Sequence, residues 1–310
     1  MTARPIIIDC DPGQDDALAL LLALASPELK VLGITTVAGN VPLALTQRNA
    51  LKVCELAGRP DMLVHAGCPR PLIRPLETAE YVHGSSGLDG ADLPEPHMSL
   101  QSKHGVDFLI DTLMVCTGRI TLATLGPLTN LAIAMIKEPR ILNQIQEIVL
   151  MGGAIAQGNV TPSAEFNIYV DPHAAHVVFT SGVKLTMLGL DVTHQVITTP
   201  ERLEAIRAIN TPVCRVAANW LDYYGTYDIE RYGFLGGPLH DPCVIAYLLQ
   251  PSLFKSRHLY VEIETTSELT IGRTVVDLWK SNKHEPNVNV VHAIDAEGFY
   301  KLLTERLAKL

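Results

Sequence analysis

The chain has 310 residues, of which 47% are hydrophobic and 18% are charged, a composition typical of soluble globular proteins. Its formal net charge is −9 and it has no dense run of Lys and Arg, which argues against a nucleic-acid partner and favours small neutral substrates or cations. The longest apolar run, residues 17–25, is shorter than the roughly 20 residues of a membrane-spanning helix. The N-terminal segment lacks the apolar core and cleavage site of a signal peptide, so we expect a cytoplasmic protein.

Short β-rich runs alternate with helical patterns along most of the chain. We predict strands at residues 5–8, 31–37, 62–64, 120–125, 148–151, 185–188, 259–263 and 288–291. We predict helices at residues 15–25, 43–56, 106–116, 128–136, 172–180, 201–208, 213–224, 243–249 and 296–310. Continuous apolar strands that alternate with helices indicate an α/β fold, with a mostly parallel sheet covered by helices on both faces. No internal repeat or linker interrupts the pattern, so we expect a single domain over residues 1–310.

The six cysteines are the next feature, and none of them form a C-x-x-C pair. Their spacing therefore favours neither a zinc ribbon nor a thioredoxin-type redox site. In a cytoplasmic protein such cysteines are reduced, so we expect free and mostly buried thiols without a catalytic role.

The segment of residues 67–101 interrupts the alternation of strands and helices. It is rich in proline, glycine and polar residues and shows weak periodicity. Loops of this length are uncommon in compact domains and often serve as active-site lids. We therefore predict a long active-site loop here, with a surface excursion of no functional role as the alternative.

Four carboxylates follow the first predicted strand, in the sequence DCDPGQDD of residues 9–16. Asp9 and Asp11 share one face of the strand because side chains alternate, and Asp15 and Asp16 open the next helix, where the helix dipole favours negative charge. Carboxylates this close repel one another, and a bound hard cation such as Ca²⁺ or Mg²⁺ removes that cost. The cluster therefore predicts a metal site, with a helix cap and surface acids as the alternative.

Further polar residues follow or precede other predicted elements. Asp241 precedes a predicted helix, where it either completes the metal site or only caps that helix. Asn159, Glu165 and Asn167 follow a predicted strand and offer amide and carboxylate groups that suit the hydroxyls of a sugar. Ligands of parallel sheets bind beyond the carboxyl ends of the strands, so these are the residues to inspect.

Together these motifs resemble the inosine-uridine-preferring nucleoside hydrolase family. The most specific match is DCDPGQDDA at residues 9–17, which fits the family signature D-x-D-P-G-x-D-D. Other matching segments are VAGN (37–40), HGSSGLDG (83–90), GPLTN (126–130), MGGA (151–154), AEFNIYVDP (164–172), GLDVTH (189–194) and HDPC (240–243). Because the matches extend along nearly the whole chain, the resemblance implies a Rossmann-like fold and hydrolysis of the N-glycosidic bond of ribonucleosides.

The resemblance also implies a tightly held Ca²⁺. By position, Asp11, Asp16 and Asp241 would be side-chain ligands, and the backbone carbonyl of Leu125 would be another ligand. Asp15 aligns with the general base that takes a proton from the attacking water. The ion would orient the ribose and activate that water.

The substrate-binding residues follow from the same resemblance. The residues that would hold the ribose or line its pocket are Asn40, Met151, Asn159, Glu165 and Asn167. His83 matches a histidine of the mobile loop. His240 matches one near the leaving base and is expected to donate a proton, because the ordinary pKa of histidine lies near neutrality; its alternative role is to fill space beside Asp241. Tyr223, Tyr224, Tyr227 and Tyr232 lie where the family places base-contacting aromatics. Of these, Tyr227 is the expected contact, with simple helix packing as the alternative.

Two positions depart from the family pattern. Gln14 fills a variable position of the opening signature, and Ser85 replaces a Glu common in the loop motif. Neither is expected to touch the chemistry, although Ser85 would alter loop closure if that Glu contributes to it.

The overall character of the motifs favours the pyrimidine-preferring bacterial type, so uridine and cytidine are expected before inosine. The resemblance further implies a homotetramer, or a dimer.

Two alternatives to this function stay open at this point. An opening strand that ends in D-x-D also resembles magnesium-dependent phosphatases of the haloacid dehalogenase type, but that reading leaves Asp15, Asp16 and the HDP segment unexplained. The second alternative is a non-catalytic nucleoside- or sugar-binding protein on the same fold. Nucleoside binding without ribose release would indicate it.

Overall fold

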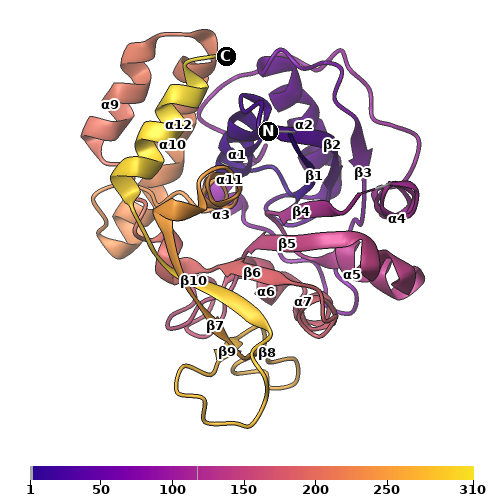
Figure 1. Ribbon diagram of the computed structural model, residues 1–310. Coiled ribbons are helices and arrows are strands. Elements are labelled where there is room, and N and C mark those ends of the chain that lie inside the picture. Colours follow the sequence, from indigo (N-terminus) through magenta and orange to yellow (C-terminus); the bar gives the residue numbers. More distant parts are fainter. Residues whose placement is uncertain (1–2, 117) are drawn as a thin grey trace.

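The computed structural model describes residues 3–116 and 118–310, so the first two residues of the N-terminal segment lie outside the described residues. An eight-stranded sheet forms the centre, in the order β3-β2-β1-β4-β5-β6-β10-β7 (Figure 1). All neighbouring strands pair in parallel except β7, which is antiparallel to β10 at the edge. The strands are β1 (Arg4–Cys10), β2 (Leu29–Thr36), β3 (Val64–Ala66), β4 (Ile120–Thr124), β5 (Ile145–Met151), β6 (Leu185–Leu188), β7 (Phe254–Leu259) and β10 (Val288–Ile294).

Helices cover both faces of this sheet, because its strands are apolar on both sides. Ile6 and Ile8 of β1 belong to one hydrophobic cluster and Ile7 to another, as expected when successive side chains point to opposite faces. The first cluster is completed by α1 (Gln14–Leu24), α2 (Leu43–Leu56), α9 (Pro200–Ile209), α10 (Pro212–Tyr232), α11 (Pro242–Leu249) and α12 (Ala296–Leu307). The second is completed by α4 (Gly105–Val115), α5 (Thr129–Lys137) and α7 (Pro172–Phe179). The predicted Rossmann-like α/β fold is confirmed (Figure 1).

The strand order reverses direction between β1 and β4. From β1 the chain proceeds to β2 and β3 on one side, and it then returns to β4 on the other side of β1. At such a switch point the connections diverge and leave a crevice beyond the carboxyl ends of the two strands. The residues that follow β1 and β4 are therefore placed where a ligand of this fold binds.

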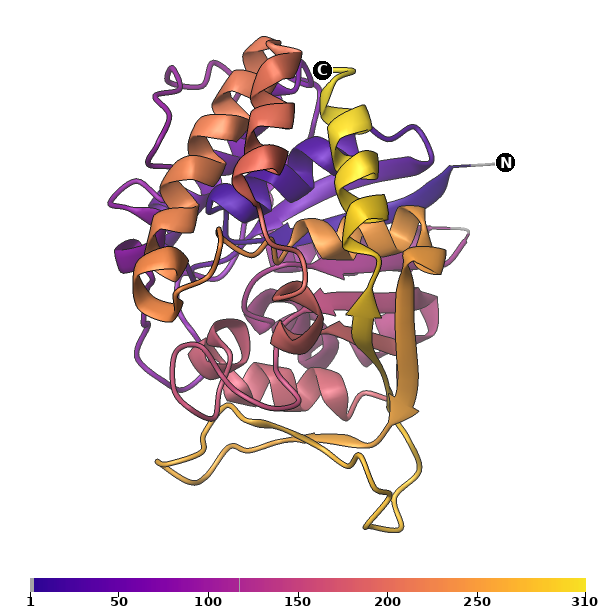
Figure 2. The ribbon, with the colours of Figure 1, turned by 90° about the vertical axis from the view of Figure 1, so that its left-hand side faces the viewer.

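Three predicted elements differ from the structure. The strand expected at residues 259–263 is split: β7 ends at Leu259, and β8 (Val261–Ile263) pairs with β9 (Thr274–Val276) in a separate two-stranded sheet. Figures 1 and 2 show this small sheet and its loops projecting from one end of the molecule. Alternating burial continues through the break, so the sequence pattern does not reveal the change of partner. The strand expected at residues 62–64 begins two residues later than predicted.

The helix expected at residues 213–224 continues as α10 to Tyr232. The predicted helix ended at Tyr224, just before Gly225, and glycine usually weakens a helix. In the structure Gly225 is needed for packing, because a Cβ there would lie 3.0 Å from the backbone nitrogen of Gly237. The glycine therefore permits a close approach between α10 and the segment before α11.

Short elements that the sequence did not predict connect these larger ones. They are α3 (Glu80–His83), α6 (Phe166–Val170), α8 (Leu190–Thr193) and the 3-10 helices η1 (Pro139–Gln144) and η2 (Pro251–Leu253). The α3 helix lies in the segment of residues 67–101, most of which is otherwise irregular. Trp220 of α10 anchors this segment by donating a hydrogen bond to the carbonyl of Leu88 at 3.2 Å.

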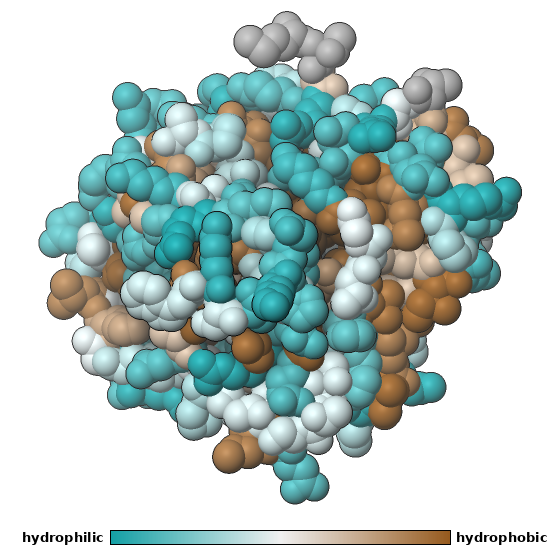
Figure 3. Space-filling view, turned by 60° about the horizontal axis from the view of Figure 1, so that its bottom comes forward, coloured by the Kyte–Doolittle hydropathy of each residue, from teal (hydrophilic) through white to brown (hydrophobic). Residues whose placement is uncertain are grey.

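The surface is mixed in character. Figure 3 shows a face that is largely hydrophilic, with hydrophobic residues gathered mainly towards one side. Within the described residues, no helix combines the length and the apolar character needed to cross a membrane.

The six cysteines are free thiols, and all but the half-buried Cys116 are buried, as predicted.

Candidate active site

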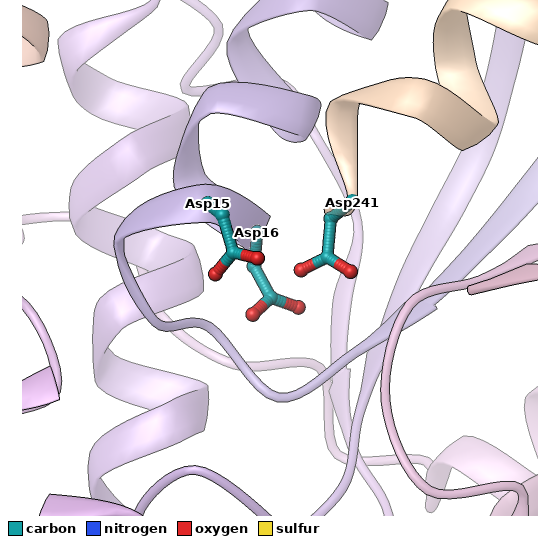
Figure 4. Close-up of side chains that lie close together, drawn as sticks. All are labelled: Asp15, Asp16 and Asp241. Atoms are coloured by element: carbon teal, nitrogen blue, oxygen red, sulfur yellow. The ribbon is translucent and has the colours of Figure 1, made fainter. Parts of the chain in front are cut away.

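The carboxylates predicted as a metal site come together at the carboxyl ends of β1 and β4. Asp11 follows β1 directly, Asp15 and Asp16 lie in the first turn of α1, and Asp241 immediately precedes α11. One carboxylate oxygen from each of Asp15, Asp16 and Asp241 lies within 4.8 Å of the others (Figure 4). Asp241 comes from a distant part of the chain, so the fold assembles this group. This trio contains Asp15, the expected base, and not the expected ligand Asp11.

Hydrogen bonds fix the carboxylate of Asp16. It accepts from the backbone N–H groups of Asp11 and Gly13, both at 3.1 Å, and from Nδ2 of Asn40 at 3.0 Å. Gly13 is the residue that precedes α1, so Asp16 caps the start of its own helix. Asp16 therefore caps α1 and also belongs to the carboxylate cluster.

Two glycines, Gly39 and Gly126, pack closely against the carboxylate of Asp11. Its Oδ2 accepts a hydrogen bond from the backbone N–H of Asn40 at 2.8 Å, while its Oδ1 is buried and has no hydrogen-bond partner among the described residues. A Cβ at Gly39 or Gly126 would overlap this carboxylate, so glycine is needed at both positions. A buried oxygen without a donor is costly unless a ligand satisfies it.

Burial and mutual repulsion raise the pKa values of the clustered acids. Burial, and then the neighbouring Asp16, raises the pKa of Asp15 to about 7, and burial raises that of Asp16 to about 6. Burial and the other carboxylates also raise the pKa values of Asp11 and Asp241 well above the ordinary range. A cation relieves this repulsion, and an all-oxygen donor set suits a hard ion such as Ca²⁺ or Mg²⁺. Together with the orphaned Oδ1 of Asp11, the donor set fits a divalent cation.

The carbonyl of Leu125, the remaining expected ligand, lies just after β4. It accepts a hydrogen bond from Nδ2 of Asn167 at 2.6 Å. A carbonyl oxygen carries two lone pairs, so this bond leaves one free for a second interaction. Asn167 thereby links the expected metal site to the residues expected to hold a sugar.

A pocket adjoins the carboxylates. Of the residues expected in the site, all but the deeper Asp11 and Asp16 line it. The expected residues that line the pocket are Asp15, Asn40, His83, Leu125, Met151, Asn159, Glu165, Asn167, Tyr227, His240 and Asp241. The structure therefore brings residues from widely separated motifs into one cavity.

Glu165 is positioned by the start of α6. Its carboxylate accepts from the backbone N–H groups of Asn167 at 2.9 Å, Ile168 at 3.2 Å and Gly153 at 2.9 Å. Burial nevertheless raises its pKa to about 7. Asn159 supports the same turn, because its Oδ1 accepts from the backbone N–H of Phe166 at 3.0 Å.

His83 is held by a residue that the sequence did not single out. Nε2 of Gln14 donates to the carbonyls of His83 at 2.9 Å and Asp89 at 3.0 Å, so the acceptor oxygen of its amide faces the imidazole. Nδ1 of His83 lies 2.7 Å from that oxygen and must therefore carry a proton. Burial lowers the pKa of His83 to about 3, which leaves a neutral ring with Nε2 as an acceptor. Gln14, which was expected not to touch the chemistry, thus positions a histidine that lines the pocket.

His240 is also neutral. Burial, and then its neighbours His194 and His83, lowers its pKa well below the ordinary value. The ordinary pKa of histidine, on which the expected proton donation rests, therefore does not apply to this buried ring. Its Nδ1 lies 2.7 Å from Oγ1 of Thr193, a contact that fixes the ring beside Asp241.

Aromatic side chains line the pocket alongside the histidines. Tyr224, Asp228 and Tyr232 lie one turn apart on α10, and all three line the pocket with Tyr227. Tyr81 of α3 packs against Tyr227 with ring centroids 5.5 Å apart. This part of the pocket offers flat, apolar surfaces that suit a heterocyclic base.

The model of the inosine-uridine preferring nucleoside hydrolase family matches residues 6–301. The chain belongs to this family. The resemblance inferred from the motifs is confirmed, and the phosphatase alternative is wrong.

Relatives of known sequence or structure agree that the chain is a nucleoside hydrolase. A pyrimidine-specific ribonucleoside hydrolase of Photobacterium profundum is 49% identical over 307 residues, which cover 99% of both chains. The structure of a plant nucleoside hydrolase is 35% identical with a TM-score of 0.91, over 98% of this chain and 99% of that chain. That of a purine-preferring ribonucleoside hydrolase from Gardnerella vaginalis is 33% identical with a TM-score of 0.92, over 98% of each chain.

Several pocket residues of this nucleoside hydrolase were not found from its sequence. They are Tyr81, His194 and Asp228, together with Gln14 behind the pocket. Helical spacing places Asp228 on the same face of a helix as Tyr224 and Tyr232, and that signal was missed because the helix was predicted to end at residue 224. His194 lies in the matching segment of residues 189–194, but nothing in its sequence context marks it as a pocket residue.

Proposed function

We propose that this nucleoside hydrolase acts on pyrimidine ribonucleosides, with uridine and cytidine as preferred substrates, and that it uses a calcium ion held by the carboxylate cluster. The observation that carries the proposal is a pocket in which buried carboxylates, side-chain amides and aromatic rings meet. The 49% identity to a pyrimidine-specific relative supports the choice of base.

The residues that would hold the ion are Asp11, Asp16, Asp241 and the carbonyl of Leu125. The orphaned Oδ1 of Asp11 and the close approach of Asp16 to Asp241 support this set. When bound, calcium supplies a positive charge that orients the ribose hydroxyls and makes a bound water more acidic. Asp15 lines the pocket beside these residues and would accept the proton of the attacking water at its carboxylate.

The ribose would be held by Asn40, Asn159, Glu165 and Asn167, with Met151 against one face of the sugar. Amide groups donate to and accept from hydroxyls, whereas carboxylates accept from them, so this mixture suits a polyol. Nε2 of His83 is an acceptor and would receive a hydrogen bond from a substrate hydroxyl. As the glycosidic bond breaks, the sugar gains positive charge, which the surrounding carboxylates stabilise.

His240 and Tyr227 would act on the base. If Thr193 donates to Nδ1 of His240, the imidazole carries its proton on Nε2 and presents it to the leaving group. A neutral histidine is a weaker acid than its cation, but it still stabilises negative charge on the departing base through a hydrogen bond. Tyr227 would stack against the base or donate a hydrogen bond to it.

We further propose that residues 1–310 form one domain with an active-site loop at residues 67–101, and that the protein is a cytoplasmic homotetramer or homodimer. The position of His83 in the pocket supports a functional role for the loop. Light scattering coupled to size-exclusion chromatography measures the oligomeric state directly. A monomer at micromolar concentration would contradict the proposed assembly.

The substrate proposal is tested by measuring kcat/KM for uridine, cytidine, inosine and adenosine with purified protein. We expect higher values for the two pyrimidine nucleosides. A higher value for inosine or adenosine would contradict the proposed base preference while leaving nucleoside hydrolysis intact.

A further inference from the structure

The β8–β9 hairpin, residues 261–276, has no part in the mechanism above, although it is tied firmly to the body of the protein (Figure 2). Val261 and Ile263 of β8 are buried in the second hydrophobic cluster, to which α7 also belongs. A two-stranded sheet is at best marginally stable alone, so this packing holds the hairpin in place. Its second strand begins at Thr274, whose side chain is buried although it does not line the pocket.

Thr274 forms two hydrogen bonds with one residue of the segment that follows β5. Its Oγ1 accepts from the backbone N–H of Ala154 at 2.9 Å and donates to the backbone carbonyl of Ala154 at 2.6 Å. A hydroxyl carries one donor and two acceptor lone pairs, so a single side chain satisfies both backbone groups. A Cβ at Gly153 would lie 2.6 Å from Cγ2 of Thr274. Thr274 therefore fixes the backbone of residues 153 and 154.

The hairpin also contacts the helix that follows Glu165. Gly272 lies just before β9 with a φ of +81°, and a Cβ there would lie 2.7 Å from Cα of Tyr169 in α6. Glycine suits this position because it adopts the left-handed conformation without strain and leaves room for the helix. The hairpin is thus in contact with the chain on both sides of Glu165, at residues 153–154 before it and at α6 after it.

The carboxylate of Glu165 lies where these two segments meet. Its Oε2 accepts from the backbone N–H of Gly153 at 2.9 Å and from that of Ile168 in α6 at 3.2 Å. One oxygen therefore bridges the segment that Thr274 holds and the helix that Gly272 contacts. A shift of either segment would move this carboxylate, because both segments supply its donors.

We propose, resting on the proposed function, that Thr274 is a positioning residue for ribose binding, which holds Gly153 and thereby the carboxylate of Glu165. Met151 lines the pocket two residues before Gly153, so a shift of this segment would also displace a second residue expected against the sugar. The segment carries none of the residues expected to hold the ion, so calcium binding should not depend on Thr274. The hairpin thus contributes to substrate binding from outside the pocket.

The proposal is tested with Thr274→Val and Thr274→Ser. Valine has the shape of threonine but lacks the hydroxyl, whereas serine keeps it. Thr266→Val is the matched control, because Thr266 is an exposed residue of the same hairpin whose Oγ1 donates only to Glu264 among the described residues. The readouts are kcat and KM for uridine, calcium content and the inhibition constant of ribose. Ribose occupies only the sugar side of the pocket, so its inhibition constant reports on that side.

We expect Thr274→Val to lower kcat/KM for uridine by about 10- to 100-fold and to raise the inhibition constant of ribose by about 10-fold, because a small displacement of a binding group has effects of this size. Its calcium content should equal that of the wild type. Thr274→Ser should stay within about threefold of the wild type in both constants, and Thr266→Val should match it, on the scale of an ordinary surface substitution.

A double variant tests whether Thr274 acts through Glu165. Glu165→Gln has one terminal acceptor in place of two, because an amide nitrogen only donates, so it disrupts the junction by itself. Substitutions that act on one shared contact are not additive. Thr274→Val added to Glu165→Gln should therefore lower kcat/KM by less than about threefold further.

Additive losses in the double variant would overturn the proposal. A Thr274→Val protein that is less stable but has wild-type kinetics would also overturn it, because the role of Thr274 would then be structural, and loss of calcium would place the effect at the metal site. If Thr274→Val does not fold, Thr274→Ala takes its place with the same expectations, because the smaller side chain leaves room for a water beside Ala154. Wild-type protein that releases ribose from no nucleoside would instead contradict the proposed function.

Discussion

Gln14 and His83 form a reciprocal pair across the active-site loop. The amide nitrogen of Gln14 donates to the His83 carbonyl at 2.9 Å, and Nδ1 of His83 donates to the amide oxygen of Gln14 at 2.7 Å. A residue at a variable position of the opening signature thus sets both the position and the tautomer of a histidine almost seventy residues away. A Cβ at the adjacent Gly13 would overlap the His83 ring, so the signature turn and the loop pack directly together.

Replacement of Gln14 by Met removes this pairing while keeping the length of the side chain. We expect Gln14→Met to lower kcat/KM for uridine by about 10- to 100-fold, because a misplaced contact residue loses productive geometry. Ser85→Ala on the same loop is the control and should retain activity, because Ser85 is exposed. Wild-type kinetics in Gln14→Met would show that His83 needs no support from Gln14.

Replacement of Asp15 by Asn tests the assigned general base. Asparagine keeps the shape of the side chain but cannot take up the proton of the attacking water. We expect kcat to fall by about 10²- to 10⁴-fold, the usual contribution of general base catalysis, with metal content and nucleoside binding retained. Elemental analysis and a binding titration accompany the kinetics, and a fully active variant would remove Asp15 from this role.

Replacement of Asp11 by Ala tests the metal site. The change removes the carboxylate whose Oδ1 has no protein partner among the described residues, and we expect it to abolish both bound calcium and turnover. Asp61→Ala is the control, because Asp61 is an exposed acid paired with Arg59. Calcium is measured by elemental analysis after dialysis, and stoichiometric calcium in Asp11→Ala would contradict the assignment.

The buried carboxyl of Glu165 predicts a pH-dependent stability. Burial raises its pKa from 4.5 to about 7, so its stabilising contribution is complete below pH 4.5 and is lost as the pH rises to about 7. Glu165→Gln cannot ionise, and its free energy of unfolding relative to the wild type should rise by up to ~3 kcal/mol between pH 4 and pH 8. Urea denaturation of both proteins in chelator measures this difference, which a pH-independent result would contradict.

Replacement of His240 by Ala tests whether this residue assists the departure of the base or has only a structural role. We expect a loss of about 10²-fold or more on uridine and a much smaller loss on p-nitrophenyl riboside, whose leaving group departs without a proton. The ratio of the two kcat/KM values is the readout. Equal losses on both substrates would assign His240 a structural role beside Asp241.

The local motifs predicted the fold and much of the candidate site well. Asp15 and Asp16 could be placed near Asp11 because one strand, one turn and one helix start determine their positions. Asn167 and Asp241 lie far away in sequence. Their positions beside predicted elements made them candidates, with a helix cap as the alternative for Asp241, and the family resemblance then assigned their roles.

The sequence failed where a contact depends on packing between elements. Gly225 favours the end of a helix, but it is needed for the close approach to Gly237, and α10 continues past it for two more turns that carry Asp228 and Tyr232. The pairing of Gln14 with His83 joins a signature turn to an irregular loop, for which no periodic pattern exists. The neutral state of His240 is likewise a consequence of tertiary burial.

The most direct test of the account is ribose release from uridine by the purified protein, before chelation, after chelation and after calcium is restored. We predict release that chelation abolishes and calcium recovers. Release that persists in protein shown to be free of metal would contradict the calcium-dependent mechanism. The absence of release from uridine, cytidine, inosine and adenosine in calcium-loaded protein would contradict hydrolysis itself and favour a nucleoside-binding protein on this fold.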